Sequence, residues 1–136
     1  MHLIAARRRR VLAACAALLA AACGGNTTSE PTRSYELPLR VDDSTDEYMY
    51  IAEDVIDLRA GDEVTFVMRN TGTLDHDLRV LDEDGRTVAA ADAVQPGDEL
   101  DLTVFFEEPG FYRLHCSVDD HLTVHGMQAI VQVADV

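Results

Sequence analysis

The sequence predicts an all-β domain, a sandwich or barrel of seven to eight short antiparallel strands. Two observations carry this prediction. Through much of the chain, apolar residues occupy every second position, as half-buried strands require. Clusters rich in Gly, Pro and Asp interrupt these runs roughly every ten residues, and no long amphipathic helical pattern is present. The 136 residues suffice for one such domain.

The folded body is expected to begin near Tyr35, after a linker at 30–34 that contains Pro31 and no apolar residue. An acidic loop follows at 42–47. Apolar alternation then predicts strands within 63–69, 76–81, 100–106, 111–116 and 128–133, and turns at 60–62, 82–85, 96–98 and 109–110. Residues 87–94 are alanine-rich and are compatible with a short helix or a loose strand.

The first 22 residues predict a signal peptide, with a basic head at 7–10 and a 12-residue apolar run at 11–22. The run is shorter than the roughly 20 residues of a spanning helix. Cys23 closes the run and opens a polar tether at 23–34, an arrangement that resembles a bacterial lipoprotein signal. We therefore expect a lipid on Cys23 and a domain at 35–136 held on the outer face of the cell membrane. Lipidation of Cys15, or simple secretion to the periplasm or beyond, is the alternative.

The charge of the exported part is strongly negative. From Cys23 onward the chain has seven arginines, no lysine and 25 acidic residues, a net charge of -18. Such a surface repels phosphate backbones, which excludes nucleic-acid binding. A basic partner protein is favoured, although solubility or adaptation to salt explains the acidity equally well.

One segment of the last third carries the residues with chemical potential. With Cys15 removed and Cys23 lipidated, Cys116 is the only thiol of the mature domain, so it is either buried and inert or a ligand. Cys116, His121 and Met127 share one loop between two strands. A thiolate, imidazoles and a weak axial thioether form the ligand set of a blue-copper site. His76, at the start of another strand, is the candidate for the second imidazole.

Simpler roles exist for each of these residues. Cys116 packs well as a small core residue, His76 has carboxylates beside it at positions 75 and 77, and Met127 begins an apolar strand. His125 competes with His121 for the metal. His115 alternates with Cys116 and is expected at the surface.

Two segments together resemble the cupredoxin family, the small blue copper proteins that include plastocyanin and pseudoazurin. Residues 60–70 with His76 are similar to the segment around the first histidine ligand, and residues 111–127 are similar to the ligand loop. The resemblance covers 35–136. It implies an eight-stranded Greek-key sandwich in which His76, Cys116, His121 and Met127 hold one copper ion.

The resemblance also implies a function. We expect single-electron transfer without enzyme activity, by a monomer whose His121 edge reaches the surface inside an apolar patch formed by Leu74, Leu122 and Val124. A redox protein with a basic docking surface would be the partner. Many members have four residues between the second histidine and the methionine, and this chain has five, so the loop must bulge. A copper chaperone or scavenger outside the cytoplasm is the alternative function.

Overall fold

The computed structural model describes residues 30–136, in which every regular element is a β-strand. The predicted signal peptide and Cys23 lie outside the described residues. The strands are β1 (Arg33–Asp42), β2 (Met49–Ala52), β3 (Asp62–Arg69), β4 (His76–Leu81), β5 (Thr87–Val94), β6 (Glu99–Phe106), β7 (Gly110–His115) and β8 (Gln128–Val133). In this part of the chain no helix is present that could span a membrane.

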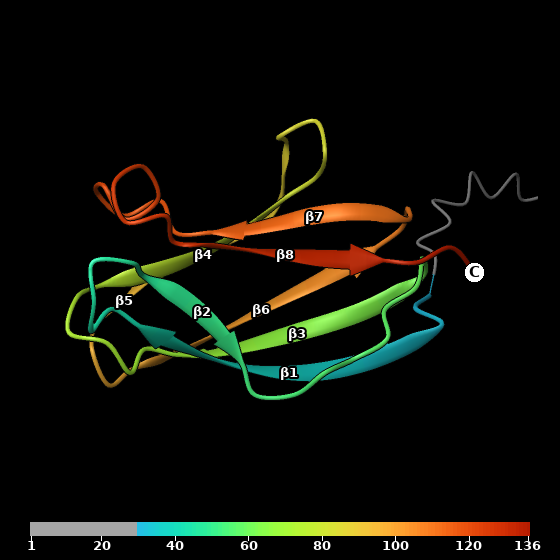
Figure 1. Ribbon diagram of the computed structural model, residues 1–136. Helices are drawn as coiled ribbons and strands as arrows, with labels where there is room; N and C mark the ends of the chain where they lie inside the picture. The colour runs from blue at the N-terminus through green and yellow to red at the C-terminus, as the bar shows by residue number, and fades with distance from the viewer. Residues whose placement is uncertain (1–29) are drawn as a thin grey trace, which may run out of the picture.

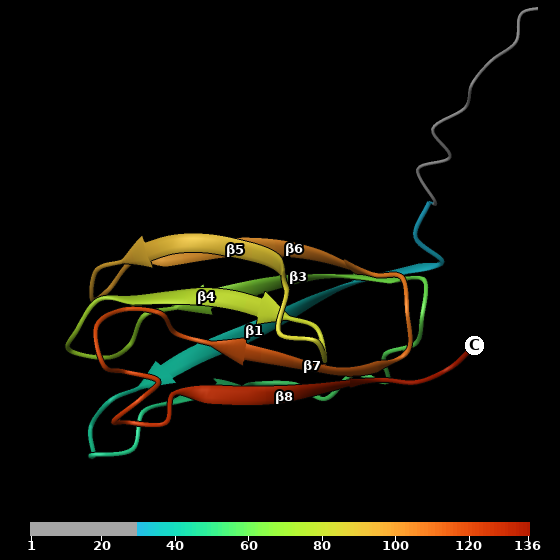
Figure 2. The ribbon, with the colours of Figure 1, turned by 90° about the horizontal axis from the view of Figure 1, so that it is seen from above.

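The eight strands form two four-stranded sheets packed face to face, with the orders β2-β1-β3-β6 and β5-β4-β7-β8 (Figures 1 and 2). The prediction of a β-sandwich is therefore confirmed. One pairing departs from the expected antiparallel pattern, because residues 33–40 of β1 run parallel to the whole of β3. A parallel pair needs a long crossover connection, and β2 with the loop after it supplies this connection.

The core follows from the period-two pattern. On β3 the residues Val64, Phe66 and Met68 are fully buried, while those between them are partly exposed. β6, beside β3 in one sheet, and β7, beside β4 in the other, alternate in the same way. The buried residues of these strands form one continuous cluster. This cluster gives the loops at the ends of the sheets a rigid support.

The structure differs from the sequence prediction at two boundaries. β1 begins at Arg33, two residues before the expected start, because Arg33 forms a bidentate ion pair with the buried Asp62 at the start of β3. The ambiguous segment 87–94 is strand β5, at the edge of its sheet and largely exposed. Small alanine side chains suit this edge position, where β5 also carries an irregularity opposite the start of β4.

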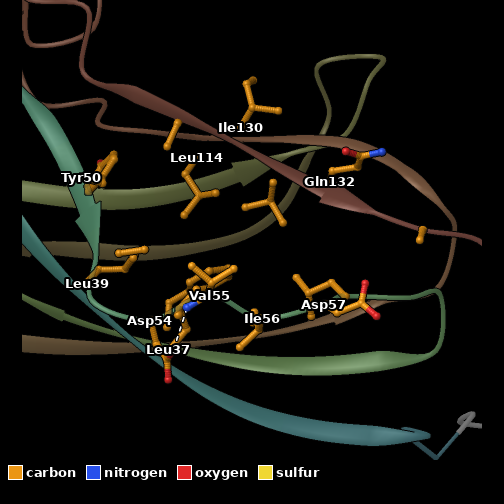
Figure 3. A pocket seen from close by; sticks show the side chains of 16 residues that line it. Leu37, Leu39, Tyr50, Asp54, Val55, Ile56, Asp57, Leu114, Ile130 and Gln132 are labelled. Atoms are coloured by element: carbon orange, nitrogen blue, oxygen red, sulfur yellow. Dashed lines mark hydrogen bonds between the residues drawn. The ribbon is translucent and has the colours of Figure 1, made fainter.

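A pocket of about 480 Å³ lies between the two sheets, beside β2, β8 and the segment that follows β2 (Figure 3). Leu37, Leu39 and Tyr50 line it from one sheet, and Leu114 and Ile130 from the other. The pocket includes none of the residues predicted to bind metal.

The loops that connect β1 to β2, β3 to β4, β5 to β6 and β7 to β8 lie at one end of the sandwich, away from the C-terminus (Figure 1). Each of the predicted ligands lies in or beside one of these loops, and the fold therefore assembles the candidate site from segments that are far apart in the sequence.

Candidate metal centre

Three of the predicted ligand residues come together in the structure. Each of His76, Cys116 and His121 offers one donor atom, and the three atoms lie within 4.8 Å of one another. All three side chains are buried: His76 and Cys116 are 0% exposed and His121 is 4% exposed. Such a group of soft and borderline donors, withdrawn from water, has the chemistry of a transition-metal site.

The distances fit a single ion. The Cys116 Sγ atom lies 3.8 Å from Nδ1 of His76 and 3.5 Å from Nδ1 of His121. A sulfur and a nitrogen bound about 2.3 and 2.0 Å from one first-row metal ion, at angles between tetrahedral and trigonal, lie roughly 3.5 to 3.8 Å apart. Both imidazoles therefore present Nδ1 at ligand spacing.

Met127, the predicted fourth donor, is held next to the cluster by its backbone. Its side chain is fully buried. Its backbone is held to two of the three donor residues, because its carbonyl accepts the N–H of Cys116 at 3.2 Å and its own N–H donates to the carbonyl of His121 at 2.9 Å. Met127 is thus fixed beside the cluster at the end of the β7–β8 loop.

The β7–β8 loop absorbs its extra residue in a wide helical turn. The N–H of Met127 reaches the carbonyl of His121 six residues back, one residue more than in the usual Schellman closure. Gly126 adopts a positive φ of 66° inside this closure, a conformation that costs glycine little. The bulge required by the five-residue spacing is therefore built into the turn, without separating Met127 from His121.

The carboxylate of Asp77 connects β4 to the β7–β8 loop. Asp77 accepts hydrogen bonds from both the N–H, at 2.6 Å, and the hydroxyl of Ser117, the residue after Cys116. The carbonyl of Asp77 accepts the hydroxyl of Tyr50 at 2.6 Å. Asp77 and Ser117 each directly follow a predicted ligand, so these bonds fix the spacing of His76 and Cys116.

The ring of His76 is held from its far side. Its Nε2 atom lies 3.0 Å from Oδ2 of Asp43, and the side chain of Asp43 is only 2% exposed. Burial by itself would raise the pKa of Asp43, but hydrogen bonds from His76 and from the backbone of Thr73 and Leu74 leave that pKa below its ordinary value. Neither of the sequence neighbours, Asp75 or Asp77, plays this part.

His125 lies outside the cluster. Its ring stacks on that of Tyr48, with centroids 4.0 Å apart, and its Nδ1 atom contacts the carbonyl of Asp46 at 2.8 Å. The same Tyr48 ring meets His121 edge-on at 5.1 Å. Of the two imidazoles that compete in the sequence, the structure therefore places His121, and not His125, beside Cys116.

His115, which was expected at the surface, is only partly exposed there. It is half-buried, and its Nδ1 atom is buried without a hydrogen-bond partner among residues 30–136. Burial lowers the pKa of His115. The side chain alternates away from Cys116 as predicted, but the sheet surface that it faces is partly covered.

Burial also sets the protonation of the cluster. It raises the pKa of the Cys116 thiol to about 11. It lowers the pKa of His121, and the neighbouring His76 lowers that pKa further. Both pKa shifts favour a neutral thiol and neutral imidazoles at neutral pH. Binding of a metal cation would therefore release the proton of the Cys116 thiol, and the cation would stabilise the thiolate that results.

Sequence reasoning missed the residues that hold the donors in place. Asp43, Tyr48 and Tyr50 come from a segment interpreted only as an acidic loop and its continuation. The contact between Asp43 and His76 spans 33 residues, and no local pattern predicts it. Of the residues that hold the donors in place, only Asp77 could be suspected from the sequence, because it is an acidic residue directly after the candidate ligand His76.

No protein-family model and no curated protein matches the chain. Solved structures do. The reduced auracyanin of Roseiflexus castenholzii aligns with a TM-score of 0.57 at 19% identity, covering 76% of this chain and 98% of that one. Auracyanin A, a blue copper protein from Chloroflexus aurantiacus, aligns with a TM-score of 0.59 at 12% identity, covering 74% and 98%.

A larger protein also contains this fold. The copper-containing nitrite reductase of Thermus scotoductus aligns with a TM-score of 0.51 at 22% identity, covering 76% of this chain but only 28% of that one. At these identities the likeness extends to the fold. The described chain has the cupredoxin-like fold, an eight-stranded β-sandwich that gathers His76, Cys116 and His121 at one end.

Proposed function

We propose that the protein binds one copper ion in a type 1 site and carries single electrons. The observation that carries the proposal is the buried cluster of one thiol and two imidazoles, whose donor atoms lie within 4.8 Å of one another at one end of a cupredoxin-like sandwich. Cys116, His76 and His121 would hold the ion, and the thioether of Met127 would be a weak fourth ligand.

When bound, copper supplies a one-electron couple between Cu(II) and Cu(I). The chain supplies the conditions under which that couple works quickly. Cys116 gives a thiolate, the two histidines give neutral Nδ1 donors, and the sheets keep water away from all three. Because β4 and the β7–β8 loop are cross-braced through Asp77 and Ser117, the donors keep their positions when the charge of the site changes. Little reorganisation means a small barrier to electron transfer.

The burial of the donors favours an electron carrier over a copper chaperone. A chaperone passes its metal to an acceptor by ligand exchange, which requires accessible donor atoms. Here His76 and Cys116 are fully buried, and His121 is almost so. Electrons cross the thin layer of protein atoms over the buried donors readily, whereas an incoming ligand does not.

We propose that the electron port is the surface over His121 and Tyr48. Leu74 and Val124 are 43% and 67% exposed beside this end of the molecule, while Leu122 is half-buried. Asp119 and Asp120 are exposed in the same loop as His121. An apolar patch next to acidic residues suits a redox partner that has a basic rim, since opposite charges speed the encounter.

For the location, the proposal rests on the sequence. We propose that the protein is exported and that Cys23 carries a lipid that tethers a monomeric domain to the outer face of the membrane. A soluble periplasmic or secreted form would follow if Cys23 is not modified.

The test is optical. The purified protein is loaded with Cu(II) and examined for the intense visible absorption of a thiolate-to-copper charge transfer, and the Cys116→Ser variant is treated in parallel. We expect the band in the parent and its complete loss in the variant. A parent that shows no band refutes the type 1 site, and a parent that has the band but exchanges electrons slowly and releases copper readily supports a chaperone instead.

A further inference from the structure

Asp43 lies outside the donor set and contacts the ring of one donor residue, His76, directly. We propose that Asp43 is a positioning residue for His76: its buried carboxylate accepts the Nε2 proton, keeps Nδ1 free for the metal, and stabilises Cu(II) relative to Cu(I). This inference rests on the proposed copper site and goes beyond it, since it concerns what sets the reduction potential.

The carboxylate of Asp43 is surrounded by hydrogen-bond donors. The backbone N–H of Thr73 lies 2.9 and 2.7 Å from its two oxygens, and the N–H of Leu74 lies 3.0 Å from Oδ2. The Nε2 atom of His76 completes this set at 3.0 Å. Every one of these contacts favours an acceptor with negative charge, so the site is built for an anion.

The β3–β4 loop is shaped to receive this carboxylate. A Cβ atom on Gly72 would lie 2.5 Å from Oδ2 of Asp43, so only glycine leaves room for it. The buried Asn70 holds the loop by donating to the carbonyls of Leu74 and Val94, at 2.8 and 2.9 Å. The cradle is therefore fixed independently of His76.

The physical consequence concerns both the ring and the charge. A carboxylate that accepts the proton of Nε2 selects one imidazole tautomer and increases the basicity of Nδ1, as outer-sphere carboxylates do in other metal sites. A buried negative charge near the ion also interacts more favourably with the more positive oxidised state. Both effects favour Cu(II).

The first test compares two neighbouring carboxylates. Asp43→Asn removes the charge and gives the backbone donors an amide nitrogen that cannot accept from them. Asp42→Asn makes the same change in net charge, but the side chain of Asp42 forms hydrogen bonds with Ser44 and not with His76. We expect Asp43→Asn to lower the Cu(II) affinity about ten- to a hundredfold and the Cu(I) affinity less, while Asp42→Asn changes the ratio of the two affinities less than twofold.

Affinity competition and spectroelectrochemistry both report this ratio. A tenfold change in it corresponds to a rise in reduction potential of about 59 mV. Equal losses of Cu(II) and Cu(I) affinity in Asp43→Asn would show a merely structural role and would overturn the inference, as would equal effects of the two variants. In either case a parent that binds copper leaves the proposed function intact, whereas a parent without copper binding rejects that function.

The second test does not depend on a variant that folds. In the 15N-labelled unmodified protein without metal, long-range proton–nitrogen correlations of the His76 ring report which nitrogen carries hydrogen. We expect a slowly exchanging proton on Nε2 and none on Nδ1. A proton on Nδ1, or a rapidly exchanging mixture of tautomers, would contradict the role of Asp43 even if copper binds.

Discussion

At the residue scale, His121 and His125 show how position decides chemistry within a single turn. Both are histidines of the β7–β8 loop, four residues apart. The Nδ1 atom of His121 lies 3.5 Å from Cys116 Sγ, whereas Nδ1 of His125 is engaged by the carbonyl of Asp46. The wide turn that ends at Gly126 turns one ring inward and the other against Tyr48.

This difference gives a prediction for two matched variants. His121→Ala is expected to abolish the thiolate-to-copper band, because the cluster then loses one of its three strong donors. His125→Ala removes an imidazole from the same turn and is expected to keep the band with at most a small shift. Titration with Cu(II), followed by visible absorption, distinguishes them. Loss of the band in His125→Ala with retention in His121→Ala would reverse the assignment.

The residues of the candidate site differ in how well the sequence alone predicts them. Cys116, His121 and Met127 were recognisable because their spacing lies within one loop, where chain connectivity limits the distance between them. Asp43 was not, because an acidic residue in an acidic loop looks like a solvated one until the fold buries it against His76. A local sequence pattern predicts which face of a strand is exposed, but it does not predict which side chain from a distant part of the chain will contact that face.

At the element scale, the parallel pairing of β1 with β3 begins at an ion pair between its first two partners, Arg33 and Asp62. Arg33 donates to both oxygens of Asp62, at 2.9 and 2.5 Å, and the N–H of Arg59 donates to Asp62 at 2.9 Å. Asp62 is 1% exposed and Arg33 is 37% exposed. A buried carboxylate with three donors stabilises the start of both strands and explains why β1 begins before Tyr35.

Neutralising Asp62 is expected to destabilise the folded protein. Asp62→Asn should lower the free energy of unfolding by about 1.5 to 3 kcal/mol, the range for hydrogen bonds to a charged group. Asp57→Asn is the control, because its ion pair with Arg59 is exposed on both sides and should matter by less than about 0.5 kcal/mol. Urea unfolding at pH 7 measures both. Equal effects would show that the burial of Asp62 is unimportant.

The same ion pair predicts a pH dependence. The hydrogen bond from Arg33 lowers the pKa of Asp62 in the folded protein. A lowered pKa means that the unfolded state binds the proton more tightly, so the stabilisation is complete above the ordinary aspartate pKa of about 3.9 and disappears as the pH falls through the lower folded value. The stability difference between parent and Asp62→Asn should therefore narrow below about pH 4.

At the scale of the whole molecule, the effect of a negative charge on the candidate copper site depends on how far from the site it lies. Asp119 and Asp120 are exposed beside the candidate copper site, and Glu107 and Glu108 are exposed at the other end of β7. The six residues of β7 separate the two acidic pairs by about 20 Å. Charge at the first pair can act on the metal and on a docking partner, whereas charge at the second is screened at physiological salt.

Neutralising the near pair should raise the reduction potential. Removing two negative charges disfavours the oxidised centre, by an amount on the order of 20 mV per charge if each acts across about 9 Å of water-like dielectric. The variant Asp119→Asn/Asp120→Asn is compared with Glu107→Gln/Glu108→Gln at low ionic strength by spectroelectrochemistry. An unchanged or lower potential in the near-site variant, or an equal rise in the distant one, would contradict the argument.

The sequence by itself determined the all-β class, most of the strands and the loop that carries Cys116, His121 and Met127. These features depend on contacts between residues that are near in the chain, and period-two burial and short spacings record them directly. Only the tertiary structure decided that β1 and β3 run parallel, that 87–94 is a strand, and that His76 and Asp43 meet beside Cys116. The parallel pairing and the meeting of His76, Asp43 and Cys116 join residues 29 to 40 positions apart, which packing of the two sheets selects and no local pattern encodes. The strand at 87–94 is decided by its pairing with β4 and not by its own alanine-rich pattern.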